Sequence, residues 1–203
     1  MSILSKVTWC ALSSGLCVGA LSAASVTLDF EGINDLTPVN NIYAGSGITF
    51  SGGSVYVSGA FGGSLNESEF PPRSGIGVFL NDANATTVLF SSPINSFRGF
   101  FTYGGPLTLN FYDSGNTLLT SILSGFSANL ALSGDIGSLP NEELIAAMLA
   151  DAIRLEILAP NADFTLDDLT INTSDVASVP EPASFALAAA GIAWMAWRQR
   201  TRP

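Results

Sequence analysis

Hydrophobic and polar residues alternate in short segments along the middle of the chain. Leu107, Leu109 and Phe111 alternate with polar residues and a tyrosine, which is the period of a strand with one buried face. Similar segments are rich in β-branched and aromatic residues and are bounded by Gly, Pro, Asn or Ser, as strands are. They lie at residues 25–30, 47–51, 54–58, 76–80, 86–90, 94–103, 106–113, 117–123, 126–132, 152–158 and 164–171. About eleven strands in one domain predict an all-β fold, and we expect a jelly-roll-like β-sandwich.

Two segments depart from the strand pattern. The sequence DSGN at residues 113–116 separates two predicted strands and favours a hairpin turn. At residues 141–151, Asn141 is a suitable N-cap, and Glu142 with Glu143 suit the positive N-terminal end of a helix. The apolar stripe of this segment is Leu144, Ile145, Met148 and Leu149. We therefore expect one short helix here, covering the core.

The closing strand changes phase near its middle. Phe164 and Leu166 share one face, whereas Leu169 and Ile171 are offset from that face by one position. Because strand side chains alternate with a period of two, burial of all four requires a bulge or bend at residues 167–168.

The N-terminal 24 residues have the pattern of a secretory signal peptide. Lys6 gives a weakly positive start, residues 7–21 are mostly apolar, and Ser22 with Ala24 satisfies the small-x-small rule of signal peptidase. We expect signal peptidase to cut after Ala24. The alternative is an uncleaved membrane anchor.

The C-terminus combines three features. They are the triplet Pro180, Glu181 and Pro182, the uncharged residues 183–197, and the cluster Arg198, Arg200 and Arg202. As a helix the uncharged stretch spans about 22 Å, less than the roughly 30 Å of a bilayer core, a gap that local thinning can close. The arginines then stay cytoplasmic by the positive-inside rule. The alternative is a core helix of the domain, which the uniform hydrophobicity and the terminal arginines disfavour.

This C-terminus resembles the PEP-CTERM sorting signal of Gram-negative bacteria in all three features. In that family a membrane-embedded exosortase cuts near the triplet and passes the protein to the cell surface or the extracellular polymer. By this resemblance Glu181 is a processing determinant, exosortase is a partner, and the inner membrane is a transient location. The expected parts of the chain are a signal peptide (1–24), a β-sandwich domain (25–173), a linker (174–179) and a sorting signal with a short transmembrane helix (180–203).

Composition excludes several classes of protein. The chain has no histidine, and both cysteines, Cys10 and Cys17, lie in the predicted signal peptide. The usual His-dependent catalytic arrangements, histidine-ligated zinc and disulfides are therefore excluded from the mature domain. Residues 25–179 contain sixteen carboxylates against three arginines, a net charge of −13. Such a surface repels phosphate backbones, so nucleic acid is not an expected partner.

Two acidic segments are candidate sites. Asp29 and Glu31 lie in LDFEG at the start of the domain, and Asp167 and Asp168 lie in FTLDDLTI at its end. Because opening and closing strands are often neighbours in jelly rolls, we expect Glu31 to lie near Asp167. The alternative is that all four are solvated carboxylates at strand ends.

The same two segments resemble the ends of calcium-containing galactose-binding and carbohydrate-binding jelly rolls. There an N-terminal FE glutamate and an aspartate of a final DD pair help to ligate a structural calcium ion. The resemblance implies Glu31 and Asp167 as calcium ligands, with Asp29 and Asp168 as further candidates.

A polysaccharide is the expected ligand, if the protein has one. All three tryptophans lie in the targeting segments, so stacking on a sugar would fall to tyrosines, and Tyr56, Tyr103 and Tyr112 are the candidates. We expect an exported cell-surface or extracellular-matrix protein with a binding or structural role, and not an enzyme. The alternative is a secreted carbohydrate-active hydrolase that uses the acidic residues, since glycosidases use paired carboxylates about 5–9 Å apart.

Overall fold

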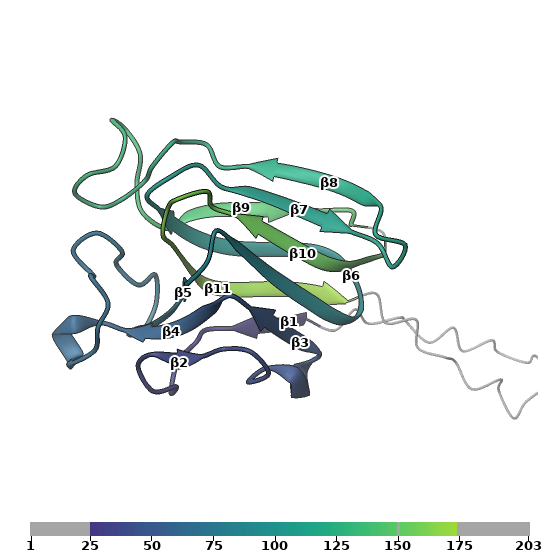
Figure 1. The fold of residues 1–203 in the computed structure, drawn as a ribbon, viewed down its shortest axis with the longest axis horizontal. Coiled ribbons are helices and arrows are strands. Elements are labelled where there is room, and N and C mark those ends of the chain that lie inside the picture. The colour runs from purple at the N-terminus through teal and green to yellow at the C-terminus, as the bar shows by residue number, and fades with distance from the viewer. Residues whose placement is uncertain (1–24, 150, 174–203) are drawn as a thin grey trace, which may run out of the picture.

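The computed structural model describes residues 25–149 and 151–173 (Figure 1). This region contains eleven strands and two short 3-10 helices. In chain order they are β1 (Ser25–Leu28), β2 (Thr37–Pro38), η1 (Ala44–Ser46), β3 (Ile48–Ser51), β4 (Gly53–Val57), η2 (Gly59–Phe61), β5 (Gly77–Asn81), β6 (Ala85–Tyr103), β7 (Thr108–Tyr112), β8 (Leu118–Leu123), β9 (Glu142–Ala146), β10 (Ala152–Leu158) and β11 (Phe164–Thr173).

The long strand β6 belongs to both layers of the fold. Its first part pairs with β3 and β10, and its last part pairs with β9 and β11. β6 passes from one set of partner strands to the other around Pro93, which has no N–H to donate to a neighbouring strand. One layer, here named the Tyr112 sheet, has the order β3-β6-β10-β7-β8. The other, the Asp167 sheet, has the order β9-β6-β11-β5-β4-β2, with β1 paired to the end of β11. All of these pairings are antiparallel.

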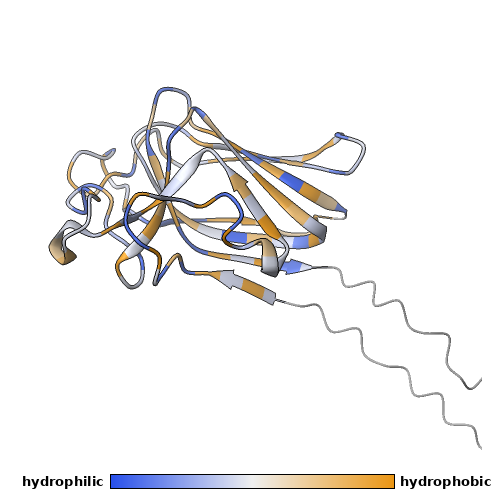
Figure 2. Cartoon of the chain, turned by 60° about the horizontal axis from the view of Figure 1, so that its bottom comes forward, coloured by the Kyte–Doolittle hydropathy of each residue, from blue (hydrophilic) through white to orange (hydrophobic). Residues whose placement is uncertain are grey.

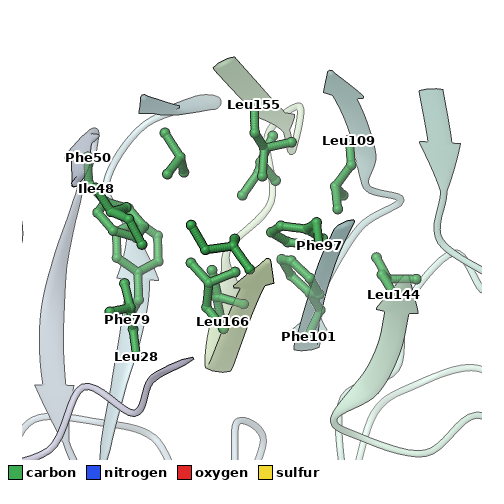
Figure 3. Close-up of a cluster of buried hydrophobic side chains, with 14 of the residues drawn as sticks. Leu28, Ile48, Phe50, Phe79, Phe97, Phe101, Leu109, Leu144, Leu155 and Leu166 are labelled. Atoms are coloured by element: carbon green, nitrogen blue, oxygen red, sulfur yellow. The ribbon is translucent and has the colours of Figure 1, made fainter. Parts of the chain in front are cut away.

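The hydrophobic core lies between these two sheets. Phe50 of β3 packs against Phe79 of β5 with ring centroids 5.4 Å apart, and Phe97 of β6 packs against Phe111 of β7 at 5.3 Å. Each pair joins one sheet to the other, and aliphatic side chains fill the space between the rings (Figure 3). Figure 2 shows hydrophobic and hydrophilic residues alternating along the strands. The predicted all-β sandwich is thus confirmed.

Local predictions are confirmed at the hairpin and at the bulge. β7 and β8 form an antiparallel pair joined by residues 113–117, and Asn116 adopts a positive φ in the turn. In β11 the register with β6 shifts between Asp167 and Thr170, and Asp168 has a φ of 46°. Leu166 and Leu169 are consequently both buried, as the phase change predicted.

The predicted helix over residues 141–151 is wrong, because part of this segment is a strand. Glu142–Ala146 forms β9 and pairs with the last part of β6. Asn141 and Met148 have positive φ values, which an α-helix does not allow. The spacing of apolar residues is compatible with a helix and with a strand. In the strand, Leu144 and Ala146 are two positions apart and both point into the core. Pairing with β6 supplies backbone hydrogen bonds across the sheet and outweighs the local helix signals.

The predicted strand over residues 126–132 is also wrong, since the structure has a loop there. Asn129, whose side chain is fully buried, explains why. Its Oδ1 accepts a hydrogen bond from the backbone N–H of Tyr103, and its Nδ2 donates to the carbonyls of Phe101 and Leu139. The Asn129 side chain thus attaches the loop to the end of β6. It bonds backbone groups there that a neighbouring strand would otherwise pair with.

No helix within residues 25–149 and 151–173 is long and apolar enough to cross a membrane. The predicted signal peptide, linker and sorting signal lie outside the described residues.

Candidate functional site

Asp167 holds a loop that comes from the distant part of the chain between β4 and β5. The Oδ2 atom of Asp167 accepts hydrogen bonds from the backbone N–H groups of Arg73 (2.9 Å) and Ser74 (3.0 Å). Its Oδ1 accepts from the N–H of Asp168 at 2.7 Å. The side chain is only 1% exposed, so both oxygens of this buried carboxylate are occupied by backbone donors.

Glu31 holds the same loop from the other side. Its Oε1 accepts from the N–H groups of Ile76 (2.8 Å) and Gly77 (2.7 Å). Between the two sets of donors lies Gly75, with a φ of +53°, and a Cβ built there would lie 2.3 Å from Glu31 Oε1. The prediction that Glu31 lies near Asp167 is therefore supported, since the two carboxylates bind the backbone of one loop on either side of Gly75. We name residues 73–77 the anchor loop.

Asp168 and Arg73 form an ion pair on the solvent side of the anchor loop. Arg73 Nε lies 3.1 Å from Asp168 Oδ2, and Ser74 Oγ donates to Asp168 Oδ1 at 3.0 Å. The Arg73 guanidinium also lies 3.4 Å from the ring centroid of Phe100 on β6. Asp29 does not bind the anchor loop; its Oδ1 accepts from the N–H of Glu31 at 3.1 Å.

The enclosed position of Asp167 changes its acid–base behaviour. Burial raises the pKa of Asp167 from 3.8 to about 6, although the N–H donors of Ser74, Asp168 and Arg73 act in the opposite direction. Burial, together with the charges of Asp29, Glu31 and Asp167, also raises the pKa of nearby Tyr43 to about 12.

The donor set around these carboxylates does not fit a calcium ion in the described arrangement. Calcium requires six to eight oxygen ligands, whereas the groups that face Glu31 Oε1 and both oxygens of Asp167 are N–H donors. Nor do the described residues contain a group of three or more acidic, cysteine or histidine residues placed to hold a metal ion. Calcium binding stays a prediction from the resemblance, and it would require the anchor loop to change its hydrogen bonds.

The three candidate tyrosines occupy different environments. Tyr103 is fully buried and its hydroxyl donates to Glu142, so the prediction that it contacts a ligand is wrong. Tyr56 is half-buried on the outer side of β4, in the Asp167 sheet. Tyr112 is half-buried on the outer side of β7, where the sequence pattern alternates between core and surface.

The outer face of the Tyr112 sheet carries an unbroken row of polar side chains. Strand register aligns one residue from each of five neighbouring strands across the sheet. In spatial order this polar row is Ser51, Thr87, Glu156, Asn110 and Ser121. Four spacings of about 4.8 Å give the row a length of about 19 Å. It therefore presents hydroxyl, carboxylate and amide groups along a line as long as a short oligosaccharide.

A second row next to it brings Arg154 and Tyr112 together. These residues are register partners on β10 and β7, and the Arg154 guanidinium lies 3.8 Å from the Tyr112 ring centroid. Arg154 Nη2 donates to Asn116 in the hairpin turn, and Tyr112 Oη lies 3.2 Å from Glu156 Oε2. Ser121 Oγ donates to Asn110 Oδ1 at 2.7 Å. The two rows together are here named the polar face; exposed Leu89 and Leu118 flank Arg154 and Tyr112 in the second row.

Sequence reasoning missed Arg154, Glu156 and Asn110 as functional candidates. The alternation in residues 106–113 and 152–158 shows that these side chains point away from the core. It does not show that they face one another, because the register between β7 and β10 is a property of the folded sheet.

A pocket elsewhere in the described region is less promising. It has a volume of about 270 Å³ and lies beside β1, η1 and the end of β11. Glycines, serines, a threonine and apolar residues line it, without a charged group. It offers neither acid–base chemistry nor a charged recognition group.

Three comparisons with known proteins bear on this picture. Residues 178–200 match the PEP-CTERM protein-sorting motif, which includes the predicted triplet and two of the three arginines. A comparison with curated proteins gave no match.

The solved structures that the chain matches share little sequence with it. A cleaved adhesin domain of Lys-gingipain has 12% identity and a TM-score of 0.45, covering 73% of this chain and 99% of that domain. A family 29 carbohydrate-binding module has 10% identity and a TM-score of 0.39, covering 79% and 100%. A DUF4465 family protein from Bacteroides caccae has 12% identity and a TM-score of 0.44, covering 74% and 99%.

The fold and the motif together define a class of protein. The domain is an all-β sandwich, and the chain carries a PEP-CTERM sorting motif at residues 178–200. This motif indicates an exported protein of a Gram-negative bacterium that is sorted by exosortase to the cell surface or the extracellular space.

Proposed function

We propose that this exported protein binds a polysaccharide at the surface of the producing cell, through the polar face of the Tyr112 sheet. The observation that carries the proposal is the alignment of five polar side chains across five strands, beside the stacked pair of Arg154 and Tyr112. Extended glycans present regularly spaced hydroxyl groups that both donate and accept hydrogen bonds. A linear row of hydroxyl, amide and carboxylate groups complements such a ligand.

Binding without cleavage is the activity that the geometry favours. Glycosidases need two carboxylates flanking the scissile bond, and within the polar row Glu156 is the single carboxylate. Asp167 and Glu31 form the other acidic site, but their oxygens accept hydrogen bonds from the anchor loop. These contacts support a structural role for the acidic pair over the hydrolase alternative.

The proposal is tested with extracellular polysaccharide isolated from the producing bacterium. Affinity electrophoresis of the processed protein should show retardation in gels containing this polysaccharide, and no reducing sugar should be released on incubation. Each neutral hydrogen bond is worth about 0.5–1.5 kcal/mol. Loss of one bond at each of two residues therefore costs about 1–3 kcal/mol, and the double variant Asn110→Ala, Tyr112→Ala should bind roughly 5- to 150-fold more weakly.

A matched control is Tyr56→Ala, which removes a half-buried tyrosine from the outer side of the other sheet. It should bind as the wild type does. Equal binding by the double variant and the wild type would reject the polar face as the site.

A further inference from the structure

The two sheets have several edges, and all but one are protected against pairing with another strand. β2 has two residues and includes Pro38, and β9 begins with two glutamates. The loop before β3 covers its edge, since the N–H groups of Phe50 and Ile48 donate to carbonyls of that loop. β1 has only four residues. Short strands, prolines, charges and covering loops are the usual means of blocking edge-to-edge association.

β8 has none of these protections over most of its length. It is a six-residue edge strand, LLTSIL, without charge, proline or glycine. Within the described region no strand pairs with its free side, and Figure 1 shows it along the upper margin of the domain. Leu118, Leu119 and Leu123 are 51%, 39% and 70% exposed. A bulge opposite Tyr112 interrupts the strand only at its beginning.

The free edge of β8 is complementary to itself. Side chains directly opposite each other in an antiparallel pair lie on the same face. In a pair of β8 strands centred on Ser121, this residue faces its own copy and Thr120 faces Ile122. Leu119, beside the bulge, faces Leu123. Apolar groups thus meet apolar groups at both ends on the outer face, with hydroxyls at the centre, and each strand contributes the same contacts, as two-fold symmetry requires.

The charge distribution permits a second copy at this edge. The domain is strongly acidic, so two copies repel each other wherever their carboxylates approach. β8 is an uncharged segment on this surface, and it lets two copies come into backbone contact without opposing like charges.

We propose that two copies of this chain associate through antiparallel pairing of their β8 strands about Ser121. The two Tyr112 sheets then become one continuous sheet. Ser121 is the last member of the polar row, so the row of one copy continues directly into that of the other and doubles in length. This consequence for ligand length rests on the proposed function, whereas the association itself does not.

Cysteine cross-linking tests the pairing in the protein without its predicted signal peptide, because Cys10 and Cys17 both lie in that segment. Residues directly opposite in an antiparallel pair have Cα atoms about 4.5–5.5 Å apart, within the range of about 4.4–6.8 Å that a disulfide requires. Ser121→Cys should form a disulfide-linked dimer under mild oxidation. Leu132→Cys is the matched control, because Leu132 is 77% exposed and lies outside β8; it should stay largely monomeric. Equal cross-linking of the two variants would overturn the proposal.

Sedimentation gives a second measurement. The wild-type protein should sediment as a dimer, and Ser121→Lys should sediment as a monomer, because two ammonium groups would then face each other at the centre of the pair. Leu132→Lys should leave the dimer intact. A wild-type protein that is monomeric at all concentrations would overturn the inference. A dimer whose polysaccharide binding is unaffected by the Asn110→Ala, Tyr112→Ala change would instead reject the proposed function alone.

Discussion

Asp167 on the closing strand accepts a hydrogen bond from the backbone N–H of Ser74, which lies 93 residues earlier in the chain. With Glu31 on the opening segment, this buried carboxylate fixes the anchor loop to the Asp167 sheet. The contact joins three parts of the sequence that are far apart, and the first three predictions follow from it.

The pKa of Asp167 predicts a specific pH dependence of stability. Because folding raises this pKa from 3.8 to about 6, the folded state binds the proton more tightly than the unfolded state. The contribution of Asp167 is therefore fully present below pH 3.8 and is lost as the pH rises through about 6. We expect this loss to lie between about 1 and 3 kcal/mol.

Asp167→Asn should remove this dependence, even though it also disturbs the hydrogen bonds to the anchor loop. The measurement is the free energy of unfolding in urea at pH 4, 5, 6 and 7, for the variant and the wild type. The difference between them should change with pH in favour of the variant as the pH rises. A constant difference over this range would contradict the prediction.

Gly75→Ala should destabilise the protein by about 2–4 kcal/mol. The alanine would have to adopt a φ of +53°, and its Cβ would lie 2.3 Å from Glu31 Oε1, which displaces the carboxylate from Ile76 and Gly77. Gly62→Ala is the control, since Gly62 has a φ of +84° and open space around a Cβ. It should cost about 1 kcal/mol from the backbone alone. Similar denaturant midpoints for the two variants would show that the contact with Glu31 is unimportant.

As long as the anchor loop keeps its hydrogen bonds, calcium should leave the melting temperature of the processed protein unchanged, because N–H groups occupy the oxygens of Asp167. The test compares melting curves in millimolar calcium and in chelator. A rise of several degrees in calcium that magnesium does not reproduce, and that Asp167→Ala abolishes, would instead establish the calcium site that the resemblance implied.

Glu181→Ala should leave unprocessed precursor in the inner membrane fraction of the host. Glu181 is the central residue of the triplet within the matched sorting motif. Replacement of Arg198, Arg200 and Arg202 by Ser should disturb membrane orientation or retention by weakening the positive-inside signal. Immunoblots of fractionated cells measure both effects, and normal processing of both variants would refute these roles.

The sequence by itself determined the features that depend on local patterns. The alternation around Leu109 identified β7, the DSGN segment identified its hairpin, and the phase change in the closing strand placed a bulge at Asp167. The sorting motif is likewise a local pattern, since its triplet, apolar stretch and arginines are contiguous. Side-chain periodicity and turn chemistry depend on a few neighbouring residues, and these can be read without the rest of the chain.

Only the tertiary structure decided which of two compatible local structures forms, and which residues meet. Residues 141–151 carry helix signals, yet β6 offers backbone partners that turn their first part into β9. Asn129 lies in a segment with a strand-like sequence, yet that segment is a loop whose Asn129 side chain bonds to the backbone at the end of β6. Tyr103 and Tyr112 are both candidate ligand contacts in the sequence, and only the packing of the two sheets buries Tyr103 and leaves Tyr112 half-buried on the outer face. The polar row arises from the register of five strands, because the hydrogen bonds that fix this register join residues far apart in the chain.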